Sequence, residues 1–184
     1  MEPFAIIEDV FSAVPLSHYR KYIISTLKAA SSDHYWKEED PGSLLYFRKK
    51  IGDLMDAAQQ LNVKTRDKKA IKQKALVKPG APDQEIIDPR LYMDSQIKHT
   101  QWEAFPRSLS KKEFVDPYLV FKRFFRNRSL KKWHRDLEEM IFYALSPHDC
   151  VEDLLDLDLL RINQLLQKLV EAAHLIWVRE INPG

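Results

Sequence analysis

The stretch from Ser129 to Leu145 constrains the fold of this chain more than any other part of the sequence. Its apolar residues recur every three or four positions, and this spacing places them on one face of a helix. They are Leu130, Trp133, His134, Leu137, Met140, Ile141, Ala144 and Leu145. The hydroxyl of Ser129 suits the helix N-cap, and Pro147 disfavours helical geometry in the residue before it. We therefore predict an amphipathic helix whose apolar face packs against other helices.

Other amphipathic stretches supply the partners for that face. The same spacing predicts five further helices, with one more turn or short helix at about residues 150–155. Counted from their caps, their ranges are about 3–13, 17–30, 43–61, 116–126 and 156–181, the last starting at Asp156 or Asp158. The chain has only four glycines, whereas β-rich folds usually need many glycines in their turns. We predict an all-α protein, built as a bundle of five or six helices.

The chain between the third and fourth predicted helices departs from this pattern. Residues 64–78 are rich in lysine, and prolines recur through the segment that follows. A loop of this length without structure of its own is uncommon inside a compact domain. We therefore predict an ordered, irregular excursion at about residues 64–111, within a single α-helical domain that spans residues 1–184.

Several classes of chemical site lack their sequence motifs. Cys150 is the only cysteine, which excludes an internal disulfide and a cysteine-based zinc site. No two histidines have the helical spacing of paired metal ligands. Neither a phosphate-binding glycine loop nor the GxSxG motif of serine hydrolases is present. We therefore predict no metal site and no cofactor.

Targeting signals are also missing from the sequence. The N-terminal residues are acidic and lack the basic region and apolar run of a signal peptide. No apolar run approaches the roughly 18 residues of a membrane span. A single cysteine suits a reducing compartment. We expect a cytoplasmic protein that does not enter a membrane. Its net charge of +2 is close to zero, so the overall electrostatic potential does not by itself indicate nucleic-acid binding.

Two basic stretches, at residues 64–78 and 122–135, indicate a candidate cationic surface. The candidate nucleic-acid-binding residues are Lys68, Lys69, Lys72, Lys74, Arg123, Arg126, Arg128, Lys131, Lys132 and Arg135. Such residues neutralise phosphates, and the interleaved Phe124, Phe125 and Trp133 would stack on bases. The alternative interpretation is a solvated cationic face, because the apolar stripes of the predicted helices need the same aromatic residues.

His134 lies on the apolar stripe where an apolar residue is expected. It is either a catalytic or ligand-binding imidazole, or a neutral core or boundary histidine with one hydrogen-bond partner. Arg128 and His134, with five residues between them at the head of a helix, resemble the arginine-to-histidine motif of HEPN ribonucleases. Arg126 and Asn127 also echo the polar second residue of that motif, at a longer spacing from His134 than is usual. HEPN proteins are α-helical bundles that often dimerise around the motif, so the resemblance implies that Arg128 and His134 form an RNA-cleaving pair.

The missing motifs and the segregation of charge favour a non-enzymatic protein-interaction or regulatory module. The acidic segments 33–40 and 136–158 balance the basic ones, which suits a protein partner or self-association. A nucleic-acid-binding protein that uses the cationic surface is the alternative. A HEPN-like ribonuclease is the second alternative.

Overall fold

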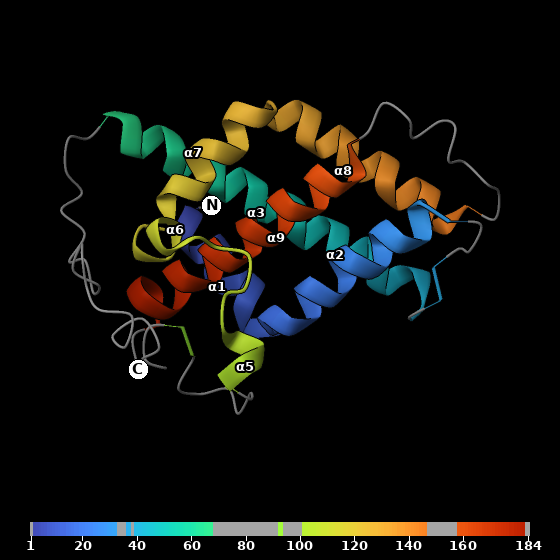
Figure 1. Cartoon of the computed structure of the whole chain (residues 1–184), viewed down its shortest axis with the longest axis horizontal. Helices are drawn as coiled ribbons and strands as arrows, with labels where there is room; N and C mark the ends of the chain where they lie inside the picture. The colour runs from blue at the N-terminus through green and yellow to red at the C-terminus, as the bar shows by residue number, and fades with distance from the viewer. Residues whose placement is uncertain are drawn as a thin grey trace.

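The computed structural model of the chain describes residues 2–32, 36–37, 39–67, 92–93, 101–146 and 158–182. The described residues form helices that pack on one another (Figure 1), and no strand occurs among them. The helices are α1 (Pro3–Ala13), α2 (Leu16–Ala30), α3 (Pro41–Asp67), α5 (Gln101–Ala104), α6 (Lys111–Val115), α7 (Tyr118–Asn127), α8 (Leu130–Leu145), α9 (Leu159–Ile176) and the π-helical turn η2 (Trp177–Ile181). The prediction of an all-α protein is confirmed.

Two predictions remain untested: the number of helices in the whole chain, and the ordered structure of the whole excursion. Two parts of the excursion, residues 68–91 and 94–100, and the predicted turn at residues 150–155 lie outside the described residues. The start of the excursion does lie within them, and there Lys64 still belongs to α3, which continues to Asp67.

Local capping explains where two of the long helices begin. The Ser129 hydroxyl accepts a hydrogen bond from the backbone N–H of Lys132 at 3.3 Å, so α8 starts where the sequence predicts. Asp158 caps α9 in the same way, and its carboxylate accepts from the backbone N–H of Arg161 at 2.9 Å. Of the two starts predicted for the last helix, the structure selects the one at Asp158.

Other helix starts differ from the prediction by one or more residues. Helix α3 begins at Pro41 rather than at Ser43, because the Asp40 carboxylate accepts from the backbone N–H of Ser43 at 3.1 Å and from its hydroxyl at 2.8 Å. A short helix that the sequence analysis missed, α6, precedes α7. It begins with a reciprocal capping box between Ser110 and Glu113.

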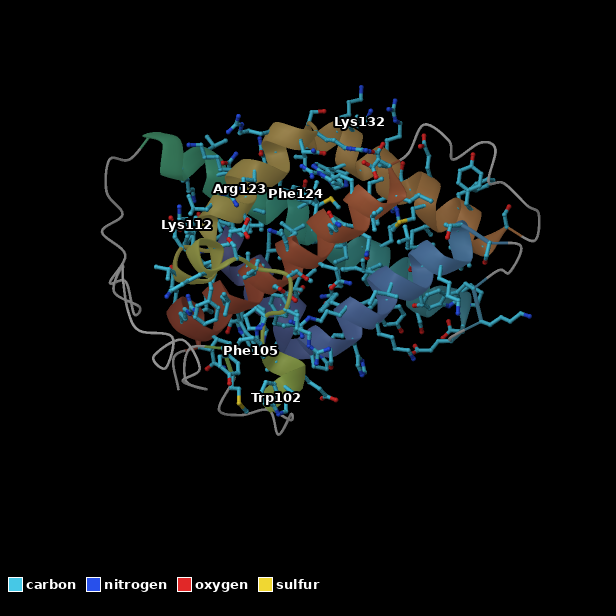
Figure 2. All side chains as sticks on the ribbon, in the orientation of Figure 1. Trp102, Phe105, Lys112, Arg123, Phe124 and Lys132 are labelled. Atoms are coloured by element: carbon cyan, nitrogen blue, oxygen red, sulfur yellow. The ribbon has the colours of Figure 1, made fainter. Side chains whose placement is uncertain are left out.

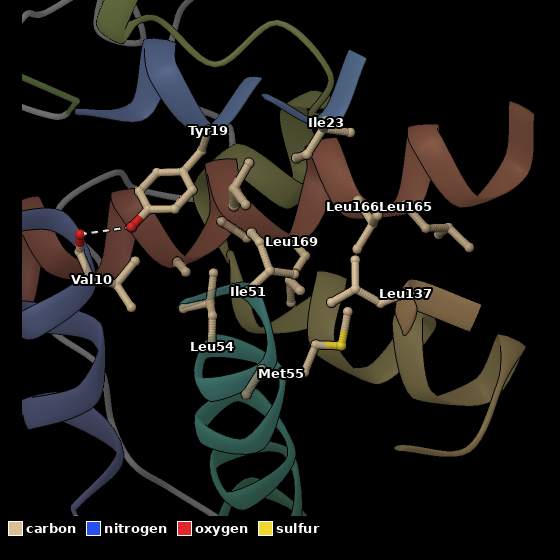
Figure 3. Packing of buried hydrophobic residues seen from close by; sticks show 14 of the residues in the cluster. Val10, Tyr19, Ile23, Ile51, Leu54, Met55, Leu137, Leu165, Leu166 and Leu169 are labelled. Atoms are coloured by element: carbon tan, nitrogen blue, oxygen red, sulfur yellow. Dashed lines mark hydrogen bonds between the residues drawn. The ribbon is translucent and has the colours of Figure 1, made fainter. Parts of the chain in front are cut away.

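The apolar stripes of the long helices close on one another and form the core. Figure 3 shows Ile51, Leu54 and Met55 of α3 and Leu137 of α8 beside the leucines of α9. Trp133 is also sealed in this core, where its ring stacks on Phe124 with centroids 4.0 Å apart. Its indole N–H donates to the Phe124 carbonyl at 3.2 Å, so the polar end of this large side chain is satisfied.

A buried ion pair fixes the segment that precedes α6. Glu171 of α9 is fully buried and accepts from the Arg20 guanidinium at 2.6 Å. The same carboxylate accepts from the backbone N–H groups of Arg107 at 3.0 Å and Ser108 at 2.7 Å. Arg20 in turn donates to the carbonyl of Phe105 at 2.6 Å. Residues far apart in the sequence therefore hold the end of the predicted excursion against α2 and α9.

Candidate anion-binding pocket

A hollow of about 470 Å³ opens between α7 and α9, next to α6. Arg123 and Arg126 lie three residues apart on α7, so both project from the same side of that helix. Arg161 and Lys168 lie two turns apart on α9 and line the facing wall. Because the apolar stripes of α7 and α9 turn toward the core, the basic residues beside each stripe meet across the groove. We call this hollow the cationic pocket.

Glu113 lies at the edge of the cationic pocket with its side chain fully buried. Its carboxylate accepts from the Lys168 ammonium at 2.7 Å, the Ser110 backbone N–H at 2.9 Å and the Arg123 guanidinium at 2.6 Å. Burial raises the pKa of Glu113, but these donors outweigh it and lower the pKa to about 2. The group therefore stays ionised, and both of its oxygens accept charge-assisted hydrogen bonds.

The charges in the cationic pocket do not balance. Its described lining residues contribute four basic side chains and one carboxylate, a net formal charge of +3. Arg123 and Lys168 share the charge of Glu113, whereas Arg126 and Arg161 form no ion pair with any residue that the structure describes. Guanidinium groups bind carboxylates and phosphates through paired hydrogen bonds. This arrangement is therefore suited to binding an anionic group.

The structure brings together some of the basic residues that the sequence singled out. Arg123 and Arg126 enter the cationic pocket, while Lys131, Lys132 and Arg135 are exposed on the first turns of α8. Figure 2 shows Arg123 on α7 and Lys132 on α8, both in the upper half of the view. Four predicted residues lie outside the described part of the chain: Lys68, Lys69, Lys72 and Lys74.

Three residues of the cationic pocket are not among the residues predicted from the sequence: Glu113, Arg161 and Lys168. Arg161, Gln164 and Lys168 have the spacing of one helix flank, which indicates a polar strip beside the apolar stripe of the last helix. The sequence therefore contained enough information to identify Arg161 and Lys168 as neighbours on one side of the last helix. The position of this strip opposite Arg123 and Arg126 depends on how α7 packs against α9, and no local pattern contains that information.

The aromatic residues within the second basic stretch belong to the core. Phe124 is 0% exposed and Trp133 is 1% exposed, so neither ring can stack on a base. Phe125 is partly buried and packs against the same core. This placement supports the interpretation of the basic stretch as the solvated side of two core-forming helices. It leaves the exposed Lys122, Arg126, Lys131 and Lys132 available to bind an anion, whereas Arg123, Arg128 and Arg135 form ion pairs.

Arg128 and His134 contact different partners. The Arg128 guanidinium forms an ion pair with the buried Asp136 and lies over the Trp133 ring, 5.5 Å from its centroid. His134 is half-buried, and its Nε2 atom lies 2.9 Å from the carboxylate of Asp56. The imidazole packs close to Gly52 of α3, where a Cβ atom would lie 3.4 Å from the ring, an ordinary van der Waals contact. The RNA-cleaving pair stays a prediction, and in the structure each member contributes to helix packing.

A second hollow, of about 490 Å³, lies between α2 and the start of α3. Its carboxylates are already engaged: Glu39 accepts from the Tyr22 hydroxyl at 2.5 Å, and Asp40 caps α3. Tyr22 is stacked between the rings of Trp36 and Phe47. Among its described lining residues, this hollow therefore has fewer charged groups available to bind a ligand than the cationic pocket has.

Within the described ranges, no three histidine, cysteine, aspartate or glutamate side chains gather in a way that could hold a metal ion. No helix in the same part of the chain has both the length and the apolar character needed to cross a bilayer. No protein-family model, curated protein or solved structure matches this chain. The geometry of the cationic pocket is thus the basis for any functional conclusion.

Proposed function

We propose that the protein is a non-enzymatic interaction module that binds an acidic group of a protein partner in the cationic pocket. The observation that supports this proposal is the convergence of four basic side chains on one open hollow. Excess positive charge in a concave site attracts acidic partners and speeds their association. Glu113, with a pKa of about 2 and its oxygens occupied, is suited to holding Arg123 and Lys168 in place rather than to transferring protons.

Fluorescence anisotropy with labelled peptide pools tests the proposal. We expect a pool rich in aspartate and glutamate to bind the full chain at low ionic strength, and to bind more weakly as salt is added. Replacing both Arg126 and Arg161 with alanine should remove most of this binding. Equal binding of a neutral pool, or robust turnover of any substrate, would contradict the proposal.

Nucleic-acid binding is the second candidate function. The observation that favours it is a set of exposed lysines outside the pocket. Lys122 lies one turn before Arg126 on α7, and Lys131 and Lys132 lie on the first turn of α8, so they extend the cationic surface beyond the pocket. A nucleic acid that crosses this surface would show a linear fall of log affinity with log salt concentration. Undetectable binding of RNA and DNA at low salt would exclude this candidate.

The proposal includes a single domain, residues 1–184, with an ordered excursion at about 64–111. The buried contacts of Glu171 with Arg107 and Ser108 support it, because they tie the end of the excursion to the helices. We expect one cooperative unfolding transition in urea, seen identically by circular dichroism and tryptophan fluorescence. Two separated transitions would show that the excursion is not part of the same unit.

A further inference from the structure

The charge of the cationic pocket discriminates between kinds of acidic group. Arg126 and Arg161 contribute two positive charges that no carboxylate among the described residues neutralises through an ion pair. One carboxylate would neutralise half of that charge. A phosphomonoester carries roughly −1.5 to −2 at pH 7, which matches the two guanidinium groups.

We infer that the acidic group is a phosphorylated serine or threonine side chain of the protein partner, an inference that rests on the proposed function. The phosphate lies between Arg126 on α7 and Arg161 on α9, and Arg123 and Lys168 remain shared with Glu113 at the edge of the site. Clusters of arginine are a recurring means of recognising phosphorylated motifs, because the planar guanidinium binds two oxygens at once.

The remaining lining residues suit a peptide that carries the phosphate. A hollow of about 470 Å³ has the size of a site for a small ligand, larger than one phosphate requires. Leu165 provides a small apolar surface, and the exposed Asn127 and Gln164 provide amide groups that can bond to a peptide backbone. The hollow therefore accommodates the modified side chain together with part of the chain that bears it.

The same surface is less suited to a nucleic acid. The described lining of the cationic pocket includes no aromatic ring, Phe124 and Trp133 are buried in the core, and Phe125 is partly buried against it. The exposed Trp102 lies on α5, at a different edge of the molecule from Arg123 (Figure 2). A single-stranded nucleic acid would gain phosphate contacts here without the base stacking that normally accompanies them.

Three labelled peptide pools, identical except for a central phosphoserine, glutamate or serine, test the inference by fluorescence anisotropy with the full chain. The phosphoserine pool should bind at least about tenfold more tightly than the glutamate pool, as expected for added charge-assisted hydrogen bonds. The variant Arg126→Ala/Arg161→Ala should lose this difference. The matched control Lys131→Ala/Lys132→Ala removes the same charge outside the pocket, and it should change the affinity by less than about threefold because exposed distant charges are screened.

The possible results separate the inference from the proposed function. Equal binding of the phosphoserine and glutamate pools, dependent on Arg126 and Arg161, would overturn the inference and leave the proposed function standing. Binding of neither pool would overturn both. Tighter binding of a single-stranded RNA, weakened equally by both double variants, would establish the nucleic-acid function instead. Circular dichroism and urea unfolding check that each variant is folded, and Arg126→Gln/Arg161→Gln replaces the alanine variant if that one is not.

Discussion

Replacing Glu113 with glutamine should destabilise the fold and strengthen anion binding at the same time. The change removes one negative charge from the edge of the cationic pocket and keeps the shape of the side chain. The pKa of Glu113 is lowered from 4.5 to about 2, which corresponds to about 3 kcal/mol of folding free energy at pH 7. Arg123 and Lys168 lose their shared counter-ion, so an anionic ligand should bind at least about threefold more tightly.

The pH dependence of this effect has a definite sign. The pKa of Glu113 is lower in the folded state than in the unfolded state, so its contribution is complete well above pH 4.5 and is lost as the pH falls toward 2. The contribution that remains at pH 3 is about 1.4 kcal/mol. The difference in stability between wild type and Glu113→Gln should therefore shrink by about half between pH 7 and pH 3.

Urea unfolding followed by circular dichroism measures this difference at both pH values. With an m-value of about 2 kcal/mol per molar urea, the expected loss at pH 7 lowers the midpoint by about 1.5 M. A difference that is the same at pH 7 and pH 3 would refute the assignment of the stabilisation to an ionised, hydrogen-bonded carboxylate. Weaker anion binding by the folded variant would show that Glu113 orients the basic groups more than it neutralises them.

Three further changes test other parts of the structure. Glu171→Gln should lower the free energy of unfolding by about 3 to 5 kcal/mol, because it removes one partner of a buried ion pair. It should also speed hydrogen exchange at the backbone amides of Arg107 and Ser108, which donate to Glu171. Unchanged exchange at these two amides would contradict the anchoring role of Glu171. Trp133→Ala should cost about 3 to 5 kcal/mol in urea unfolding, since it empties a fully packed core site, and a cost below about 1 kcal/mol would show that the ring is not part of the core. We expect the wild-type protein not to cleave RNA. If cleavage is found, loss of it in a folded His134→Ala variant would support the HEPN-like alternative, and cleavage that survives would end it.

The sequence was sufficient to predict helices whose stripes and caps are local. Ser129 and Asp158 cap α8 and α9 because each side chain bonds to an amide three residues ahead, a relation that is visible in the sequence. The same kind of signal, Ser110 followed by Glu113, marks α6 and was overlooked. The all-α class and the role of Trp133 in the core follow from such local patterns.

Only one wall of the cationic pocket, the one on α7, could be predicted from the sequence. Arg123 and Arg126 stand out as charge on a basic helix, but the sequence does not indicate that Arg161 and Lys168 face them. A partnership such as Arg20 with Glu171 joins residues 151 positions apart, and its formation depends on how the helices pack. Such pairings are decided by the match of whole apolar faces, so charge in the sequence identifies the candidates and tertiary packing selects among them.

Arginine side-chain NMR tests most directly the claim that Arg126 and Arg161 bind an anionic group. The Nε–Hε resonances of the full chain are followed while phenyl phosphate, a phosphomonoester, is added at constant ionic strength. We predict that the signals of Arg126 and Arg161 shift together and saturate with one dissociation constant, while that of Arg135, which is exposed on α8 near Glu139, moves little. Shifts of Arg126 and Arg161 that are no larger than that of Arg135, or that never saturate, would contradict the account.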